Sequence, residues 1–199
     1  MPELHKPGQA RHVGGIAIMD MPRVTSILSP YQDFSGIPPE TLAAAAERGT
    51  NLHKACAAYA LGLYYPVSGD IAGFYESFKA WFNNYVVEVL AVEEEVIHPA
   101  WRYVGHVDLI AKVAGIRPNQ AVAVIDYKSP AAASRGWNCQ VAAYLEASKD
   151  KYGAEIAGAL QLKKDGSLPR MIWIENPAQA FNAFVGMLNG FNYMKGGGN

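Results

Sequence analysis

Apolar and polar positions alternate most clearly in the middle of the chain, where two strands are predicted. Residues 121–125 are all small or β-branched apolar residues, a composition typical of a strand that is buried on both faces of a sheet. Residues 103–113 form a second strand-like run, and the segment 115–120, which contains a glycine and a proline, predicts a turn between the two. The pattern therefore predicts a β-hairpin.

Charged residues stand at matching positions of this predicted hairpin. Asp126 and Lys128 end the second strand, and because side chains alternate along a strand they share one face while Tyr127 takes the other. The hairpin sets Asp108 of the first strand beside Asp126. An Asp-x-Lys pair at a strand end is commonly a surface ion pair. Two neighbouring carboxylates, however, repel each other, and a bound cation relieves the repulsion. Oxygen ligands without a His/Cys cluster favour Mg²⁺ or Mn²⁺ over zinc.

The rest of the chain shows helical and strand-like spacing in a mixed order. Arg48-Gly49-Thr50 is expected to interrupt the first helical stretch, with Thr50 capping the helix that follows. Helices are expected at 39–47, 51–61, 71–86, 134–149 and 177–194, and further strands at 90–97, 155–163 and 168–175. This order predicts an α+β fold, α/β in the broad sense, with a central mixed sheet of about five strands flanked by helices.

We interpret residues 1–199 as a single domain, because no linker or internal repeat divides them. Prolines and glycines within 1–22 predict an irregular arm with a short strand near 16–19, and the glycine-rich segment 195–199 predicts a flexible tail. The aromatic stripe of the helix at 71–86 is expected to pack into the core rather than to form a platform for stacking bases.

Composition limits the classes of function. The net charge of −1 and the pI near 6.5 give no global signature of nucleic-acid binding, so charge must act locally. Cys56 and Cys139 suit a reducing compartment and are too few for an iron–sulfur cluster or a structural zinc site. Residues 1–15 lack an apolar signal core, and no run approaches the roughly 20 apolar residues of a membrane span. We therefore expect a cytoplasmic protein with no membrane partner.

Five short motifs follow one another between residues 48 and 144. They are Arg48-Gly49-Thr50-x-x-His53, Glu93, Gly105-x-x-Asp108, Asp126-x-Lys128 and Gln140-x-x-x-Tyr144. In this order and spacing they resemble the RecB-like branch of the PD-(D/E)XK nuclease superfamily, most of all its small single-domain exonucleases of phage recombination and mitochondrial genome maintenance. The resemblance implies a restriction-endonuclease-like core and a metal-dependent deoxyribonuclease. It also implies action in DNA recombination, repair or phage DNA processing, and a host-cytoplasm location if the chain is phage-encoded.

The same resemblance implies roles for individual residues. Asp108 and Asp126 would ligate one or two Mg²⁺ or Mn²⁺ ions together with the backbone carbonyl of Tyr127. Lys128 would orient the attacking water or stabilise developing charge. His53 would complete the metal shell or touch the scissile phosphate.

Further expected roles rest on the later motifs. Glu93 is preferred over Glu95 as a metal ligand because of its distance from Gly105, and the alternative is that this acidic run forms a solvated strand edge. Gln140 would hold a water or a phosphate in the catalytic centre, with simple helix packing as the alternative. DNA contacts are expected from Arg48, Ser129, Arg135 and Tyr144. The alternatives are that Arg48 braces the helix junction, that Ser129 and Arg135 are solvated surface residues, and that Tyr144 packs its helix on the sheet.

The expected substrate is DNA that is single-stranded or has free ends, and recombination or replication proteins are candidate partners. The expected reaction is that of an exonuclease, with endonuclease action as the alternative. The alternative to an enzyme is a non-catalytic nucleic-acid-binding or structural protein on the same scaffold, although near-neutral charge is a poor basis for tight passive binding.

Overall fold

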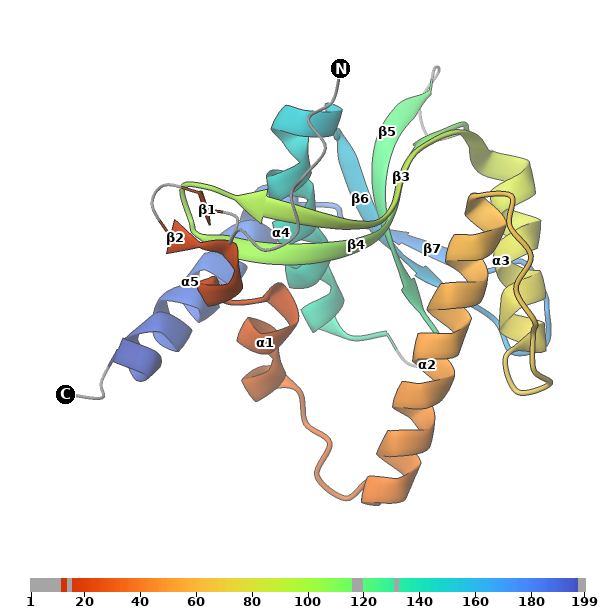
Figure 1. The fold of residues 1–199 in the computed structure, drawn as a ribbon, viewed down its shortest axis with the longest axis horizontal. Helices are drawn as coiled ribbons and strands as arrows, with labels where there is room; N and C mark the ends of the chain where they lie inside the picture. The colour runs from red at the N-terminus through yellow and green to blue at the C-terminus, as the bar shows by residue number, and fades with distance from the viewer. Residues whose placement is uncertain (1–11, 14–15, 116–119, 131–132, 197–199) are drawn as a thin grey trace.

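The central element of the fold is a five-stranded mixed sheet with helices on both faces (Figure 1). The computed structural model describes residues 12–13, 16–115, 120–130 and 133–196. The strands lie in the order β3-β4-β5-β6-β7, and every neighbouring pair is antiparallel except β5 and β6. Their bounds are Val86–His98, Tyr103–Val113, Ala121–Lys128, Ile156–Gln161 and Arg170–Trp173. The predicted α+β fold class is confirmed.

The predicted hairpin is formed by β4 and β5. Leu109 pairs with Ile125 and Val113 with Ala121, so that Asp108 and Asp126 occupy the next positions toward the same end of the pair. The expected turn at 116–119 lies outside the described residues.

Helix α4, Arg135–Tyr152, connects β5 to β6 and makes their parallel pairing possible. The Ser134 side chain caps the helix by accepting a hydrogen bond from the Gly136 N–H at 3.2 Å. The helix ends at Gly153, whose φ of +65° suits the left-handed cap. Because β5 and β6 run in the same direction, their carboxyl ends meet at one edge, where Lys128 pairs with Gln161.

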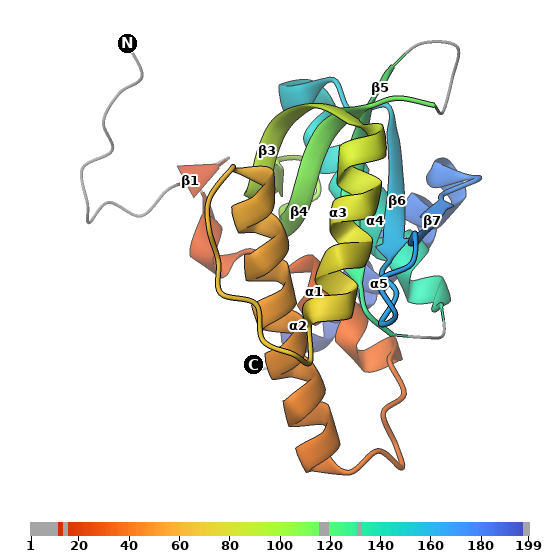
Figure 2. The same cartoon turned by 90° about the vertical axis from the view of Figure 1, so that its right-hand side faces the viewer.

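The two faces of the sheet carry separate helices and separate cores (Figure 2). On one face, α2, Pro39–Ala60, and α3, Ala72–Tyr85, pack over β4 to β6. On the other, α4 is joined by α1, Val24–Leu28, and α5, Pro177–Gly196. Phe74, Phe78 and Trp81 of α3 are buried, so the prediction that its aromatic stripe belongs to the core is confirmed.

The predicted break at Arg48-Gly49-Thr50 is wrong, because α2 runs without interruption through these residues. Instead of capping a new helix, the Thr50 hydroxyl donates a hydrogen bond to the Ala46 carbonyl at 3.0 Å, one turn back in the same helix. Burial of Leu52 in the next turn favours the continuous helix.

Both ends of the chain are more regular than expected. Strand β2 covers only Ile16–Ala17, pairs with β1, His12–Val13, and is followed by a 3-10 turn, Ile18–Asp20. Ile18 is buried against Val104 of β4, so this part of the predicted arm is packed. Residues 195 and 196 belong to α5 rather than to a tail. The rest of both predicted segments, at 1–11, 14–15 and 197–199, lies outside the described residues.

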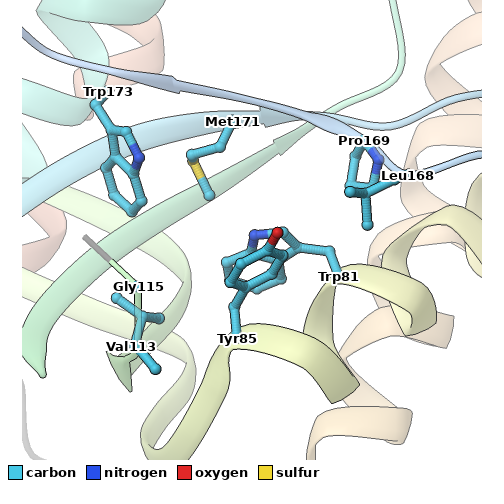
Figure 3. A pocket seen from close by; sticks show the side chains of 9 residues that line it. Trp81, Tyr85, Val113, Gly115, Leu168, Pro169, Met171 and Trp173 are labelled. Carbon is cyan, nitrogen blue, oxygen red and sulfur yellow. The ribbon is translucent and has the colours of Figure 1, made fainter.

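A pocket of about 240 Å³ opens between α3 and the edge strand β7. In Figure 3, Trp173 and Met171 point from β7 toward Tyr85 and Trp81 of α3. Val113 also lines the pocket, so the pocket lies at the end of β4 that is remote from Asp108.

No helix in the described part of the chain combines the length and the apolar character needed to cross a membrane.

The beginning of α3 packs directly on the turn between β6 and β7, and this contact depends on Gly73. A Cβ atom at this position would lie 1.7 Å from the Lys164 carbonyl oxygen. We expect Gly73→Ala to lower the free energy of unfolding by about 3 kcal/mol, because backbone must move to make room. The measurement is denaturant unfolding followed by circular dichroism.

Gly186→Ala is the matched control, since a Cβ atom at this helical glycine of α5 would meet nothing beyond its own stretch of helix within 4 Å. It should raise the free energy of unfolding by about 0.5–1 kcal/mol, because alanine is the better helix former. Similar effects of the two substitutions would contradict the close approach at Gly73.

Candidate functional site

Asp108 is a buried carboxylate that joins three elements of the fold. Its Oδ2 accepts a hydrogen bond from the Tyr127 N–H of β5 at 2.6 Å, and its Oδ1 lies 3.0 Å from Nδ1 of His53 on α2. Its side chain is only 6% exposed. These two partners replace the water that burial removes, as a buried carboxylate requires.

Glu93 adopts a strained backbone conformation in the middle of β3. Its φ is +51°, and among the described non-glycine residues only Arg102 also has a positive φ. Pairing of Val92 with Leu109 and of Glu94 with Val107 places Glu93 opposite Asp108. Such a conformation costs about 1–3 kcal/mol and persists where other interactions hold it.

The Glu93 carboxylate has one occupied and one open oxygen. Its Oε2 lies 2.7 Å from Nε2 of His106, the residue after Gly105 in β4. Its Oε1 is buried and has no hydrogen-bond partner in the described part of the chain. A buried oxygen without a donor is costly in a folded protein, and a water molecule or an ion is the usual partner of such a group.

His53, Glu93 and Asp108 together form a cluster of potential metal ligands. One ligand atom from each residue lies within 4.8 Å of the others. The cluster borders a pocket of about 390 Å³ that His53 and Glu93 line together with Ala46, Gly49, Thr50 and Lys54. Two carboxylates and an imidazole are a donor set that a divalent cation such as Mn²⁺ accepts.

Asp126, Lys128 and Gln140 form a second set on the face of the sheet covered by α4. Lys128 Nζ lies 2.6 Å from Asp126 Oδ2 and donates a hydrogen bond to Gln140 Oε1 at 2.9 Å. Gln140 Nε2 donates to Asp126 Oδ1 at 3.1 Å. The amide therefore presents its oxygen to the ammonium and its nitrogen to the carboxylate, which satisfies both charges. Asp126 lies in this set and not in the three-residue cluster, and its expected role as a shared metal ligand stays a prediction.

Tyr144 is buried between α4 and the sheet. The residue is only 2% exposed, which favours helix packing over a contact with DNA. Its hydroxyl instead accepts a hydrogen bond from Gln140 Nε2 at 3.0 Å. A Cβ at Gly105 would lie 2.7 Å from the Tyr144 ring, which explains why a glycine stands three residues before Asp108.

The other expected site residues surround this centre. Tyr127 directs its ring into the core beneath α2 and α3, where it contacts His53 and Phe78, while its N–H binds Asp108. Arg48 is half-buried on α2, and its Nε has no hydrogen-bond partner among the described residues. Ser129 lines a pocket beyond the end of β5, and Arg135 is exposed at the first turn of α4.

His106 is a site residue that the sequence interpretation missed. Its contact with Glu93 holds that carboxylate at the cluster. Strand alternation carries the signal that could have identified it, since residues 106 and 108 share one face of β4.

Opposing charges shift the pKa values of the site. Burial alone would raise the pKa of Asp108, but the charge and hydrogen bond of His53 and the Tyr127 N–H lower it. For His53, burial acts to lower the pKa, and the charges of Asp108, Asp126 and Glu93 outweigh it and raise the pKa to about 9. Burial raises the pKa of Asp126, against the opposing effect of Lys128. His53 is therefore a cation at neutral pH.

These values predict how the stability of the metal-free protein depends on pH. His53 binds its proton more tightly in the folded state than in the unfolded state, where its pKa is near 6.5. Its contribution is therefore fully present below pH 6.5 and is lost as the pH rises through about 9. We expect a loss of about 1–2 kcal/mol across this window in EDTA, reduced by solvent screening because a third of the side chain is exposed.

Chemical denaturation at a series of pH values measures this loss. His53→Gln keeps a hydrogen-bond donor beside Asp108 but cannot titrate, so its stability should change less between pH 6.5 and 9. Equal slopes for the variant and the unchanged protein would show that His53 does not titrate there.

No model of a known protein family matches the chain, and no curated protein matches it significantly.

Proposed function

We propose that this protein is a divalent-metal-dependent deoxyribonuclease of the RecB-like branch of the PD-(D/E)XK superfamily, with a restriction-endonuclease-like core. One observation carries the proposal. The acidic cluster of His53, Glu93 and Asp108 is joined through the Tyr127 backbone to the charged set around Lys128. Carboxylates that can hold a cation and an ammonium that can act on a water thus meet at the end of β5, as phosphodiester hydrolysis requires.

The residues fit a resident Mg²⁺ or Mn²⁺ ion, and we propose that one or two ions bind here. Oε1 of Glu93 is buried without a hydrogen-bond donor among the described residues. The backbone of Glu93 is also strained, and some interaction must offset that strain. A cation beside Oε1 would satisfy it and would offset that strain. Asp108, Glu93 and His53 would hold the ion, with Asp126 and the Tyr127 carbonyl as the further ligands that the resemblance implies.

A bound divalent ion supplies polarisation of a phosphate oxygen and a lower pKa for an attacking water. The chain's own residues do the rest. Asp126 and Gln140 hold the Lys128 ammonium from two sides, so that its remaining hydrogen-bonding capacity can orient a water or stabilise charge on the reacting phosphate. Tyr144 fixes Gln140 and so acts on the reaction only indirectly.

The proposed substrate is DNA with free ends or in single-stranded form, and the proposed reaction is exonucleolytic hydrolysis. Recombination, repair or phage DNA processing is the proposed setting, with recombination or replication proteins as partners and the cytoplasm of the cell or of the host as the location. The pocket of about 390 Å³ beside His53 has room for part of a nucleotide next to the cluster.

Cleavage of end-labelled linear DNA tests the activity. We expect digestion with Mg²⁺ or Mn²⁺ and none in EDTA. Lys128→Ala should lower the rate by about 10²–10³, because it removes the cation that acts on the water or the phosphate. Lys112→Ala is the matched control, since this lysine pairs with Glu88 on the outer part of the sheet. Circular DNA should survive if the enzyme requires an end, and full activity of Lys128→Ala would refute the assignment.

Metal-induced stabilisation tests the ligand set without any DNA. Binding of Mn²⁺ to the folded protein alone should raise the free energy of unfolding by about 2.7 kcal/mol at 100 times the dissociation constant. Glu93→Gln should lose most of this increment, because it removes the anionic oxygen of the cluster. Glu95→Gln, two residues along the same strand, should retain it. Thermal unfolding with and without Mn²⁺ measures the increment, and equal loss in both variants would argue against Glu93 as the ligand.

A further inference from the structure

A pocket of about 230 Å³ begins where the strand that carries the proposed catalytic residues ends. It is lined by Phe74, Ser129, Gln161, Leu162, Lys163 and Lys164. The Leu162 N–H donates a hydrogen bond to the Lys128 carbonyl at 2.7 Å. The residue that follows β6 therefore lies beside the backbone of the proposed catalytic lysine. Ligands of sheets with parallel strands commonly bind beyond the carboxyl ends of those strands.

Two cations of this pocket are available to a ligand. Neither Lys163 nor Lys164 forms an ion pair with a carboxylate in the described part of the chain, in contrast to Lys112, Lys149 and Lys151. The N–H and hydroxyl of Ser167 donate to the nearby Asp165 carboxylate at 3.0 and 2.7 Å and lower its pKa, and the charge of Lys163 acts in the same direction, so this one carboxylate offsets part of the charge of the two lysines. The ammonium groups therefore give the pocket a local positive charge that the net charge of the chain does not reveal.

The backbone around the pocket is fixed before any ligand binds. The Lys163 N–H donates to the fully buried hydroxyl of Ser77 on α3 at 3.0 Å. The Lys164 carbonyl touches Gly73, so that α3 lies directly against this turn (Figure 2). Gln161 is 4% exposed and donates to the Pro130 carbonyl at 2.9 Å, which fixes the chain after Ser129. Both walls are therefore held in place, which lowers the entropic cost of binding.

We infer that this pocket is a phosphate subsite, formed by Lys163, Lys164 and Ser129, that binds the DNA backbone phosphate next to the reacting one. The inference rests on the proposed nuclease function. Ammonium groups and a hydroxyl are the side chains that position phosphates without reading sequence. Ser129 follows Lys128 directly, and consecutive Cα atoms are about 3.8 Å apart. A strand whose reacting phosphate lies at the end of β5 can therefore place a neighbouring phosphate in the pocket.

Binding of a fluorescent single-stranded oligonucleotide in EDTA, without cleavage, tests the subsite. We expect the double variant Lys163→Ala/Lys164→Ala to bind more weakly and to show a shallower dependence of log Kd on log salt concentration. The slope should fall by about 0.7 for each phosphate contact that is lost. Lys112→Ala/Lys195→Ala changes the net charge equally at remote sites and should keep the slope of the unchanged protein. Matching thermal unfolding of both double variants establishes that they are folded.

A neutral methylphosphonate placed at successive linkages of the oligonucleotide locates the contact. In the unchanged protein one linkage should cost affinity, and that cost should shrink in Lys163→Ala/Lys164→Ala, because the two changes remove the same interaction. The same cost in both proteins, or an unchanged salt slope, would overturn the subsite. Stabilisation by inorganic phosphate without any effect of the double variant on oligonucleotide binding would also overturn it, in favour of a site for free phosphate.

Failure of the subsite is distinguishable from failure of the proposed function. If the unchanged protein cleaves DNA with Mg²⁺ while the salt slopes of all variants agree, only the subsite is wrong. If it neither cleaves nor binds DNA, both are wrong.

Discussion

The buried carboxylate of Asp108 is the constraint on which the rest of the site depends. Removing a carboxylate from water costs several kcal/mol unless charge and hydrogen bonds compensate. Here the compensation comes from the Tyr127 N–H of β5 and from His53 of α2. Both partners must be in register with Asp108, so the site depends on the pairing of β4 with β5 and on the packing of α2 over the end of this hairpin.

The charges of the candidate site leave one carboxylate in excess. Glu93, Asp108 and Asp126 contribute three carboxylates, and the cations beside them are Lys128 and protonated His53. A histidine must be neutral to ligate a metal, so a divalent ion entering the cluster would displace the proton. Protonation of His53 and binding of an ion are therefore two alternative ways to compensate the negative charge of the carboxylates. The strained backbone of Glu93 favours the ion, because a proton on His53 leaves Glu93 Oε1 without a partner among the described residues.

Patterns with a short period predicted most of the fold. Alternation alone identified the hairpin and the shared face of Asp126 and Lys128, which the 2.6 Å ion pair confirms. Local sequence signals gave wrong predictions where tertiary contacts override local preference, as at the predicted break in α2. Gly and Thr cost a helix interior less than about 1 kcal/mol each, and burial of the next turn of α2 offsets that cost. The left-handed φ of Glu93 and the burial of Tyr144 against Gly105 leave no mark in a periodic pattern, because each depends on residues distant in the chain.

The division of the site between the two faces of the sheet has a mechanistic consequence. The acidic cluster faces α2, whereas Lys128 is held on the side of α4 by Asp126 and Gln140. Charges still act between the two sets, since Lys128 contributes to the lowered pKa of Asp108 and Asp126 contributes to the raised pKa of His53. Gln140 keeps Lys128 and Asp126 together, because its amide bonds both. Opposite charges on separate elements thus leave the net charge of the chain near zero while each set keeps a local charge of its own.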